Sequence, residues 1–198
     1  MIAEAIRRSA LADYTDRFAA LSAATGGALS IRELSFASQL NLRADPDDGR
    51  VMQRLASSLG FALPIVPNMV ASAKDRRALW LGPDEWLVVG PDGQQAAIEQ
   101  ELRAGLDGAF GSIVDASANR TVLEVRGVKA RELLAHGVPI DLDVRSFAPG
   151  RCAQTVLAKA QVIVEVSDEG TLRTFARSSF AIYVAEWLLD AAAGLSLR

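Results

Sequence analysis

Two side chains in this sequence could form a nucleophile–base pair, namely the single cysteine and the single histidine. Cys152 follows Arg151, and a neighbouring positive charge can lower the pKa of a thiol. In an extended segment, however, adjacent side chains point to opposite faces, and His136 is separated from Cys152 by a long loop. No third residue that would orient the histidine is evident. The spacing therefore favours a small buried residue at the start of a strand.

The sequence offers even fewer residues that could bind a metal ion or a nucleotide. A zinc site typically takes three or four Cys, His or carboxylate ligands, which one cysteine and one histidine cannot supply. The two glycine-rich phosphate-binding motifs, G-x-G-x-x-G and G-x-x-x-x-G-K-[ST], do not occur in the sequence. Trp80 and Trp86 could stack on a ligand, but we favour packing in a core or an interface. We therefore expect no catalytic residue, no cofactor-binding residue and no metal ligand on this chain.

The composition is that of a globular protein with a sizeable core. Half of the 198 residues are hydrophobic, and the net charge of −3 is not segregated along the chain. The absence of a basic cluster argues against nucleic-acid binding. No segment offers the ~20 uncharged apolar residues that a bilayer requires, and the N-terminus does not resemble a secretory signal. We expect a cytoplasmic protein that binds neither nucleic acid nor membrane.

The elements that must position these residues fall into two groups. We expect residues 1–28 to form a partly ordered N-terminal arm, followed by one domain, 29–198, with two lobes at about 29–118 and 119–198. In the first lobe the pattern predicts extended segments over 28–43, a helix capped by Asp45 and closed by Gly60, an irregular piece over 61–69, a hairpin over 78–90, a helix from about 94 to Leu106, and a strand near 112–117.

The second lobe repeats this plan. The pattern predicts a strand over 121–127, a short helix over 128–136, a loop over 138–151, strands over 152–158, 161–167 and 171–177 with a turn at Lys159-Ala160, and a helix capped by Ser178 or Ser179 that runs to about Ala193. The predicted fold class is α+β, with two similar α/β lobes. Each lobe is a small, mainly antiparallel sheet with helices on one face.

The last helix is apolar on two sides. Its first side is formed by Phe180, Val184, Trp187, Leu188 and Ala191. Ile182 and Leu189 lie nearly opposite, and a helix of this kind needs two apolar neighbours. Two interpretations stay open at this point: the helix is buried between the chain's own halves, or one side meets another subunit.

Four segments carry a resemblance to a known family. They are LGPDEWLVVG (81–90), VDASANRTVLEVRGVKARELLAHGVPIDL (114–142), FAPGRCAQTVLA (147–158) and RSSFAIYVAEWLLDAA (177–192). Together they resemble the gamma subunit family of bacterial heterotetrameric sarcosine oxidases, over about residues 30–193. PGRCAQT and SFAIYVAEWLLDA are the most specific parts of this resemblance.

The resemblance implies a complex of four different subunits that demethylates sarcosine oxidatively. The products would be glycine, hydrogen peroxide and a one-carbon unit passed to tetrahydrofolate. It also implies that FAD, FMN, NAD, zinc and tetrahydrofolate belong to the alpha, beta and delta subunits, with none on this chain. In such a complex we expect a non-catalytic, assembly-stabilising role. Besides Ile182 and Leu189, candidate interface residues are Arg145 and Arg151, because arginine is enriched at interfaces.

A wider similarity leads to the aminomethyltransferase of glycine cleavage, whose N-terminal lobe the predicted fold resembles. In that enzyme a Gly-Gly-apolar-apolar-Asp-Asp run carries the essential aspartate, whereas residues 160–165 here read AQVIVE. Val164 cannot bind an amine, and Glu165 would point to the other face of its sheet. The similarity therefore implies a transferase-like fold without transferase chemistry. The alternatives are an autonomous folate-dependent one-carbon enzyme and a stand-alone small-molecule-binding domain.

Overall fold

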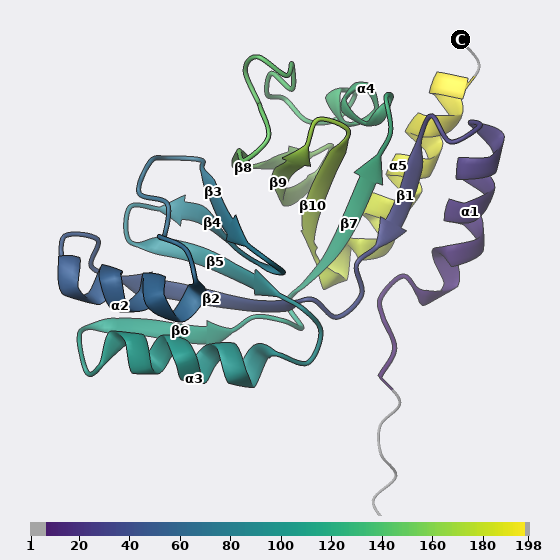
Figure 1. Ribbon diagram of the computed structural model, residues 1–198. Helices are drawn as coiled ribbons and strands as arrows, with labels where there is room; N and C mark the ends of the chain where they lie inside the picture. The colour runs from purple at the N-terminus through teal and green to yellow at the C-terminus, as the bar shows by residue number, and fades with distance from the viewer. Residues whose placement is uncertain (1–6, 197–198) are drawn as a thin grey trace, which may run out of the picture.

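The computed structural model describes residues 7–196 of the chain (Figure 1). Its elements in chain order are η1 (Ala12–Tyr14), α1 (Thr15–Ala24), β1 (Ser30–Glu33), β2 (Ser38–Ala44), α2 (Gly49–Leu59), β3 (Val70–Ala73), β4 (Arg76–Gly82), β5 (Glu85–Gly90), α3 (Gln95–Leu106), β6 (Gly111–Asp115), β7 (Arg120–Arg126), α4 (Ala130–Ala135), β8 (Cys152–Leu157), β9 (Ala160–Asp168), β10 (Thr171–Arg177), η2 (Ser178–Phe180) and α5 (Ala181–Ser196).

The strands form two five-stranded sheets in which neighbouring strands are antiparallel. One sheet, called the N-sheet here, has the order β3-β4-β5-β2-β6. The other, called the C-sheet, has the order β1-β7-β10-β9-β8. Helices α2 and α3 cover one face of the N-sheet, and α1, α4 and α5 cover one face of the C-sheet (Figure 1). The predicted α+β class, with helices on one face of each sheet, is confirmed.

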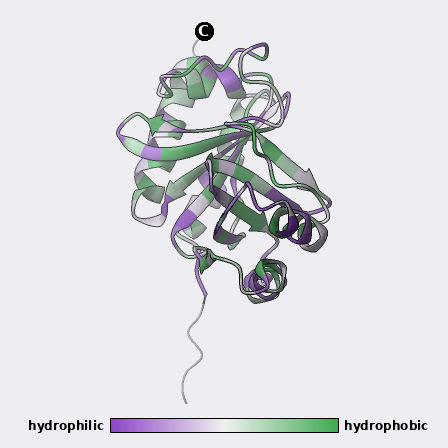
Figure 2. Cartoon of the chain, turned by 90° about the vertical axis from the view of Figure 1, so that its left-hand side faces the viewer, coloured by the Kyte–Doolittle hydropathy of each residue, from purple (hydrophilic) through white to green (hydrophobic). Residues whose placement is uncertain are grey.

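The core consists of three clusters, one per helix-covered face and one shared by the two sheets. The helix-covered faces bury the alternate apolar residues of the strands, so the strands are mostly green in Figure 2. The inner faces contribute a third cluster that contains Leu79, Leu87, Val89, Val122, Cys152, Ile163 and Phe175. Two edge strands also meet, because the backbone of Arg151 pairs with Met69 and the N–H of Cys152 donates to the carbonyl of Asn68. The two sheets are thus packed and hydrogen-bonded to each other.

The N-terminal segment is more ordered than the sequence indicates. Residues 15–24 form α1, in which Phe18 is buried against the helices of the C-sheet. Tyr14 and Arg17 both bond to the carboxylate of Glu186 on α5. Residues 1–6 of the expected arm lie outside the described part of the chain. The helix has few large apolar residues, so its periodicity is weak, and the contacts with α5 stabilise it.

Three further details differ from the expectations. Asp48, not Asp45, caps α2 by accepting hydrogen bonds from the N–H groups of Arg50 and Val51. The turn between β8 and β9 is Ala158-Lys159, one residue earlier than expected, and Ala158 has a φ of 51°. The edge strand β3 directly follows the irregular segment, and no strand was expected there. Its burial pattern has no clear alternation, which explains why the sequence does not indicate it.

Candidate functional site

Cys152 is a buried strand residue. Its side chain has no exposed surface, and its Sγ lies 3.7 Å from the carbonyl oxygen of Met69 and 3.6 Å from that of Trp80. Burial raises the pKa of the Cys152 thiol to about 12, with the Glu165 carboxylate adding to the rise. His136 is exposed, and its Nδ1 lies 2.7 Å from the carbonyl oxygen of Glu132. The thiol and the imidazole therefore have separate partners, and Cys152 remains protonated at neutral pH.

The two hairpin tryptophans belong to the core of the N-sheet. Trp86 is fully buried and its Nε1 donates to the carbonyl oxygen of Pro64 at 2.7 Å. Trp80 is its cross-strand neighbour and packs against the same cluster. Within residues 7–196, no group of three or more His, Cys, Asp or Glu side chains is placed to hold a metal ion. No helix in this part of the chain is long and apolar enough to cross a bilayer.

The four candidate interface residues lie apart from one another and in different settings. Arg145 is exposed and its Nε donates to Asp143 at 2.8 Å, and Arg151 takes part in the backbone contact between the sheets. Ile182 is 58% exposed at the start of α5. Leu189 is half-buried and packs against the core of the C-sheet. The two residues of α5 that were expected to share one side therefore differ, and Ile182 is the more accessible.

A row of alternating charges crosses the inner face of the C-sheet. In register across the strands lie Arg32 (β1), Glu124 (β7), Arg173 (β10) and Glu165 (β9). The Nε of Arg32 donates to Glu124 at 2.8 Å, and the Nε of Arg173 donates to the other carboxylate oxygen of Glu124 at 3.0 Å. We call these four residues, with Arg77 of β4, the closed row. No local pattern in the sequence indicates this row, because the register between distant strands has no local signal.

Glu165 connects the closed row to the N-sheet. Its carboxylate lies 3.4 Å from Nη1 of Arg77 and 3.5 Å from Nη1 of Arg173. Desolvation raises the pKa of Glu165 to about 7, the Arg77 guanidinium opposes this rise, and the Glu124 carboxylate adds to it. Val164, by contrast, is buried on the helix-covered face. The expectation that these two neighbours point to opposite faces is confirmed, and the acid is engaged in ion pairs.

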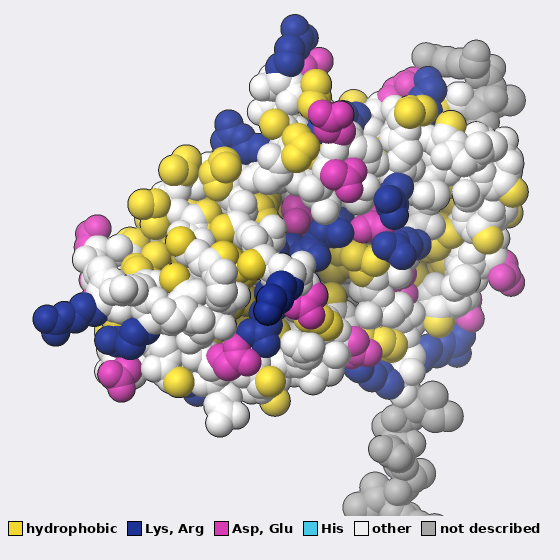
Figure 3. All heavy atoms as spheres, viewed as in Figure 1, with side chains coloured by type: hydrophobic (Ala, Val, Ile, Leu, Met, Phe, Trp, Pro, Cys, Tyr) yellow, Lys and Arg dark blue, Asp and Glu magenta, His cyan; other side chains and the backbone are white. Residues whose placement is uncertain are grey.

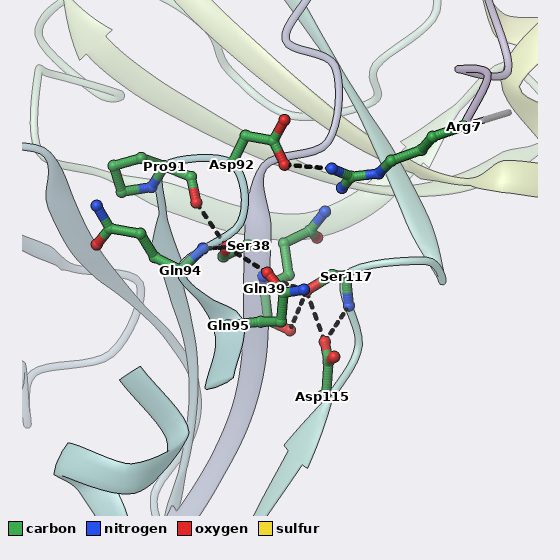
Figure 4. Close-up of polar contacts among 9 residues, drawn as sticks. All are labelled: Arg7, Ser38, Gln39, Pro91, Asp92, Gln94, Gln95, Asp115 and Ser117. Carbon is green, nitrogen blue, oxygen red and sulfur yellow. Dashed lines mark hydrogen bonds and ion pairs between the residues drawn. The ribbon is translucent and has the colours of Figure 1, made fainter. Parts of the chain in front are cut away.

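The strand β2 is fixed at its start by a cluster of short polar contacts (Figure 4). The hydroxyl of Ser38 donates to the carbonyl of Pro91 at 2.5 Å and accepts from the N–H of Gln94 at 3.1 Å. The N–H of Gln39 donates to the hydroxyl of Ser117 at 3.0 Å, and that hydroxyl in turn donates to Asp115. These contacts hold the chain where it passes from the C-sheet to the N-sheet, and the buried Oε1 of Gln39 is left without a hydrogen-bond partner among the described residues.

The face seen in Figure 3 has no single-sign surface. Lys and Arg side chains alternate with Asp and Glu along the band where the two sheets meet, and hydrophobic side chains gather on the N-sheet side. The exposed apolar side chains include Ile65 and Val66 in the loop before β3.

Comparison with known proteins decides the family. The model of the sarcosine oxidase gamma subunit family matches residues 43–194. The chain belongs to this family. It is 39% identical to a sarcosine oxidase subunit gamma of Arthrobacter sp., over 84% of this chain and 81% of the relative. The identity to a sarcosine oxidase subunit gamma of Corynebacterium sp. (strain P-1) is 36%, over 94% and 90% of the two chains.

Similarity to solved structures supports the same family assignment. A chain of the heterotetrameric sarcosine oxidase of Corynebacterium sp. U-96, in complex with pyrrole 2-carboxylate, superposes with a TM-score of 0.85 and 34% identity over 96% of both chains. The glycine cleavage aminomethyltransferase T of Bartonella henselae superposes with a TM-score of 0.66 and 15% identity, over 86% of this chain and 48% of that protein. The second likeness concerns the fold alone, and it confirms the expected similarity to the aminomethyltransferase fold.

Proposed function

We propose that this chain is the gamma subunit of a heterotetrameric sarcosine oxidase and that it stabilises the assembly without a catalytic centre of its own. The observation that carries the proposal is the match to a chain of such an oxidase along 96% of both lengths, at 34% identity. In this proposal the complex converts sarcosine to glycine and hydrogen peroxide and passes the one-carbon unit to tetrahydrofolate. The complex would work in the cytoplasm.

The proposal assigns the redox and one-carbon chemistry to the alpha, beta and delta subunits. FAD, FMN, NAD, zinc and tetrahydrofolate would be bound there. This assignment is supported by the surroundings of Cys152 and Glu165, the two residues of this chain that are best suited to catalysis. Cys152 is a buried, protonated thiol, and the carboxylate of Glu165 is held between two arginines. Neither side chain is available to a substrate.

An autonomous folate-dependent transferase is the alternative, and the local structure at β9 argues against it. At the place of the transferase's aspartate pair stand Val164, which packs under the helices, and Glu165, which faces the N-sheet. An acid that must bind an amine has to be reachable, whereas Glu165 is 3% exposed. The shared fold therefore does not extend to the transferase site.

The end of η2 and the start of α5 form the best-supported part of the proposed subunit interface. Phe180, Ile182 and Tyr183 are exposed to 41%, 58% and 37%, and the rings of Phe180 and Tyr183 pack edge to face with centroids 6.2 Å apart. Exposed aromatic and aliphatic side chains on a rigid helix are typical of interface anchors. Arg145, Arg151 and Leu189 remain further proposed contacts.

Co-purification tests the proposal. The chain is tagged and expressed with the neighbouring subunits, and the purified material is examined by native mass spectrometry and for sarcosine-dependent peroxide formation. We expect a complex of four different chains, and a tagged chain that is colourless and inactive when purified alone. Recovery of the chain only as a monomer or homo-oligomer would overturn the proposed function.

A pair of variants tests the interface within the same experiment. Ile182→Glu introduces a charge into the exposed apolar group and should reduce recovery of the complex while leaving the free chain folded. Val128→Glu is the matched control, because Val128 is 87% exposed outside α5. If the two variants assemble equally well, Ile182 does not lie in the subunit interface.

A further inference from the structure

Two arginines face each other across adjacent strands at one end of the C-sheet. Arg120 of β7 is the direct cross-strand partner of Arg177 of β10. By the alternation of side chains along a strand, they share the inner face of the sheet with Val122 and Phe175. Like charges placed directly opposite each other in a sheet are destabilising. This pair, which we call the open pair, therefore needs an explanation.

Neither guanidinium of the open pair has an acidic partner within the described residues. No carboxylate lies within 4.0 Å of either one, although the closed row on the same face provides two for its three arginines. Arg120 is partly buried, and its burial and the charge of Arg177 both lower the pKa of Arg120, while Glu85 opposes this effect. The free chain thus holds two adjacent guanidinium groups without a direct ion-pair partner, and the charge of Arg120 is offset in part by Glu85 beyond ion-pair distance.

The open pair lines a pocket of about 300 Å³. Gln154, Thr155 and Gln161 provide polar groups to it, and Ile163 and Phe175 are among its apolar lining. The Nε2 of Gln154 donates to the carbonyl of Leu81 at 2.7 Å, which anchors this side of the pocket to β4. The volume is at the lower end of the range for small-ligand pockets, and one or two convergent charges over apolar side chains are typical of such sites.

We propose that this pocket binds a carboxylate group, held by Arg120 and Arg177, with the attached carbon chain against Ile163 and Phe175. The planar guanidinium matches a carboxylate through two parallel hydrogen bonds. A free inorganic phosphate would satisfy the arginines but would gain nothing from the apolar side of the pocket. The carboxylate belongs either to a small organic acid or to an acidic side chain of a neighbouring subunit.

The first arm of the test uses the purified full-length chain. Butyrate and its neutral analogue butyramide are titrated in separate experiments, followed by NMR shifts of the pocket amides. We expect saturable binding of one butyrate and no binding of butyramide. Arg177→Gln should weaken butyrate binding about tenfold or more, since a hydrogen bond to a charged group is lost. Arg177 is exposed, so this variant is expected to fold, and a proton spectrum checks that it does.

Arg145→Gln is the matched control, because it removes an exposed arginine that already has the partner Asp143. Its affinity for butyrate should equal that of the unmodified chain. If butyrate fails to saturate, or if the Arg177→Gln and Arg145→Gln chains bind it equally, the carboxylate site is refuted.

The second arm repeats the butyrate titration on the four-subunit complex and identifies the source of the carboxylate. Binding that is lost on assembly shows that an acidic side chain of another subunit occupies the pocket, and binding that persists shows a site for a small acid. This arm rests on the proposed function, whereas the first does not. If the chain binds butyrate but recruits no partner subunits, the proposed assembly role is refuted and the carboxylate site is supported.

Discussion

The open pair and the C-sheet residues of the closed row lie on the same face of the same sheet, and both groups contain arginines, yet the surroundings of these arginines are opposite. In the closed row, Glu124 accepts from Arg32 and Arg173, and Glu165 lies between Arg173 and Arg77. In the open pair, two arginines are neighbours with no carboxylate between them. Every arginine of the closed row has a carboxylate partner within the chain, whereas neither arginine of the open pair has one within 4.0 Å among the described residues.

The comparison teaches that the neighbours of a charged residue, more than its type, separate a structural role from a binding role. A buried charge without a partner is costly, so a folded chain supplies partners to the charges that it buries for its own stability. A partly buried charge that lacks one reduces the stability of the free chain and is available for binding.

Loss of the central acid of the closed row should destabilise the chain most. Glu124 is 2% exposed and bonds to both Arg32 and Arg173, so Glu124→Gln leaves Arg173 without its closest partner. Breaking a buried pair in this way costs about 3–5 kcal/mol. Urea unfolding of the full-length chain measures this loss.

Glu99→Gln is the control for the closed row. Glu99 pairs with Arg103 one turn further along α3, at the surface, and such pairs contribute about 0.3–0.5 kcal/mol. If both variants lost the same small amount, the closed row would have no special structural role.

The thiol at the end of the closed row should be nearly inert. Cys152 is the cross-strand neighbour of Glu165, and its pKa is raised from 9.0 to about 12. The folded chain should therefore hold about a thousandfold less thiolate than the unfolded chain and react correspondingly more slowly with iodoacetamide at about pH 8. Labelling rates with and without urea check this, and rapid labelling of the folded chain would show that the end of the row is open to solvent.

The closed row should also make the stability depend on pH. The pKa of Glu165 rises on folding from 4.5 to about 7, so its protonated form is favoured in the folded chain. The corresponding stabilisation is complete below the unfolded pKa and is lost as the pH rises through the folded pKa. We expect the free energy of unfolding to decrease between about pH 5 and pH 8, and Glu165→Gln to remove this slope.

A different carboxylate provides an internal check on the sign. Arg17 and Tyr14 lower the pKa of Glu186 to about 2, so its contribution is present above the unfolded pKa of 4.5 and is lost only in more acidic solution. The two effects have opposite signs and separate pH ranges. A decrease in stability above pH 5 that persisted in Glu165→Gln would assign the slope to another group.

Much of the fold could be predicted from the sequence because its strong signals are local. The helix at 49–59 has a regular apolar stripe and a glycine at its end, and the hairpin at 76–90 has a proline turn between two apolar runs. Helix α1 lacks such a stripe and depends on contacts with α5. Strand β1, expected to group with the first lobe, pairs with β7 in the C-sheet. The placing of the lobe boundary near residue 118 remains a prediction.

The charged groups of the inner faces could not be predicted in the same way. The pattern of β7 shows that Arg120, Val122 and Glu124 share a face, but it does not show what lies opposite them. Only the register places Arg173 beside Glu124 and Arg177 beside Arg120. A two-residue shift of β10 would separate both pairs, so the difference between the closed row and the open pair is a property of the assembled sheet.

Unfolding of the open-pair variant tests the central claim most directly. Removing both charges with Arg120→Gln and Arg177→Gln relieves a cross-strand repulsion, which is typically worth about 0.2–1 kcal/mol. Urea unfolding of the free full-length chain should therefore show that the double variant is at least as stable as the unmodified chain, and the small gain should shrink at high salt. A loss of several kcal/mol, comparable to that of Glu124→Gln, would contradict the account, because the open pair would then also hold the fold together.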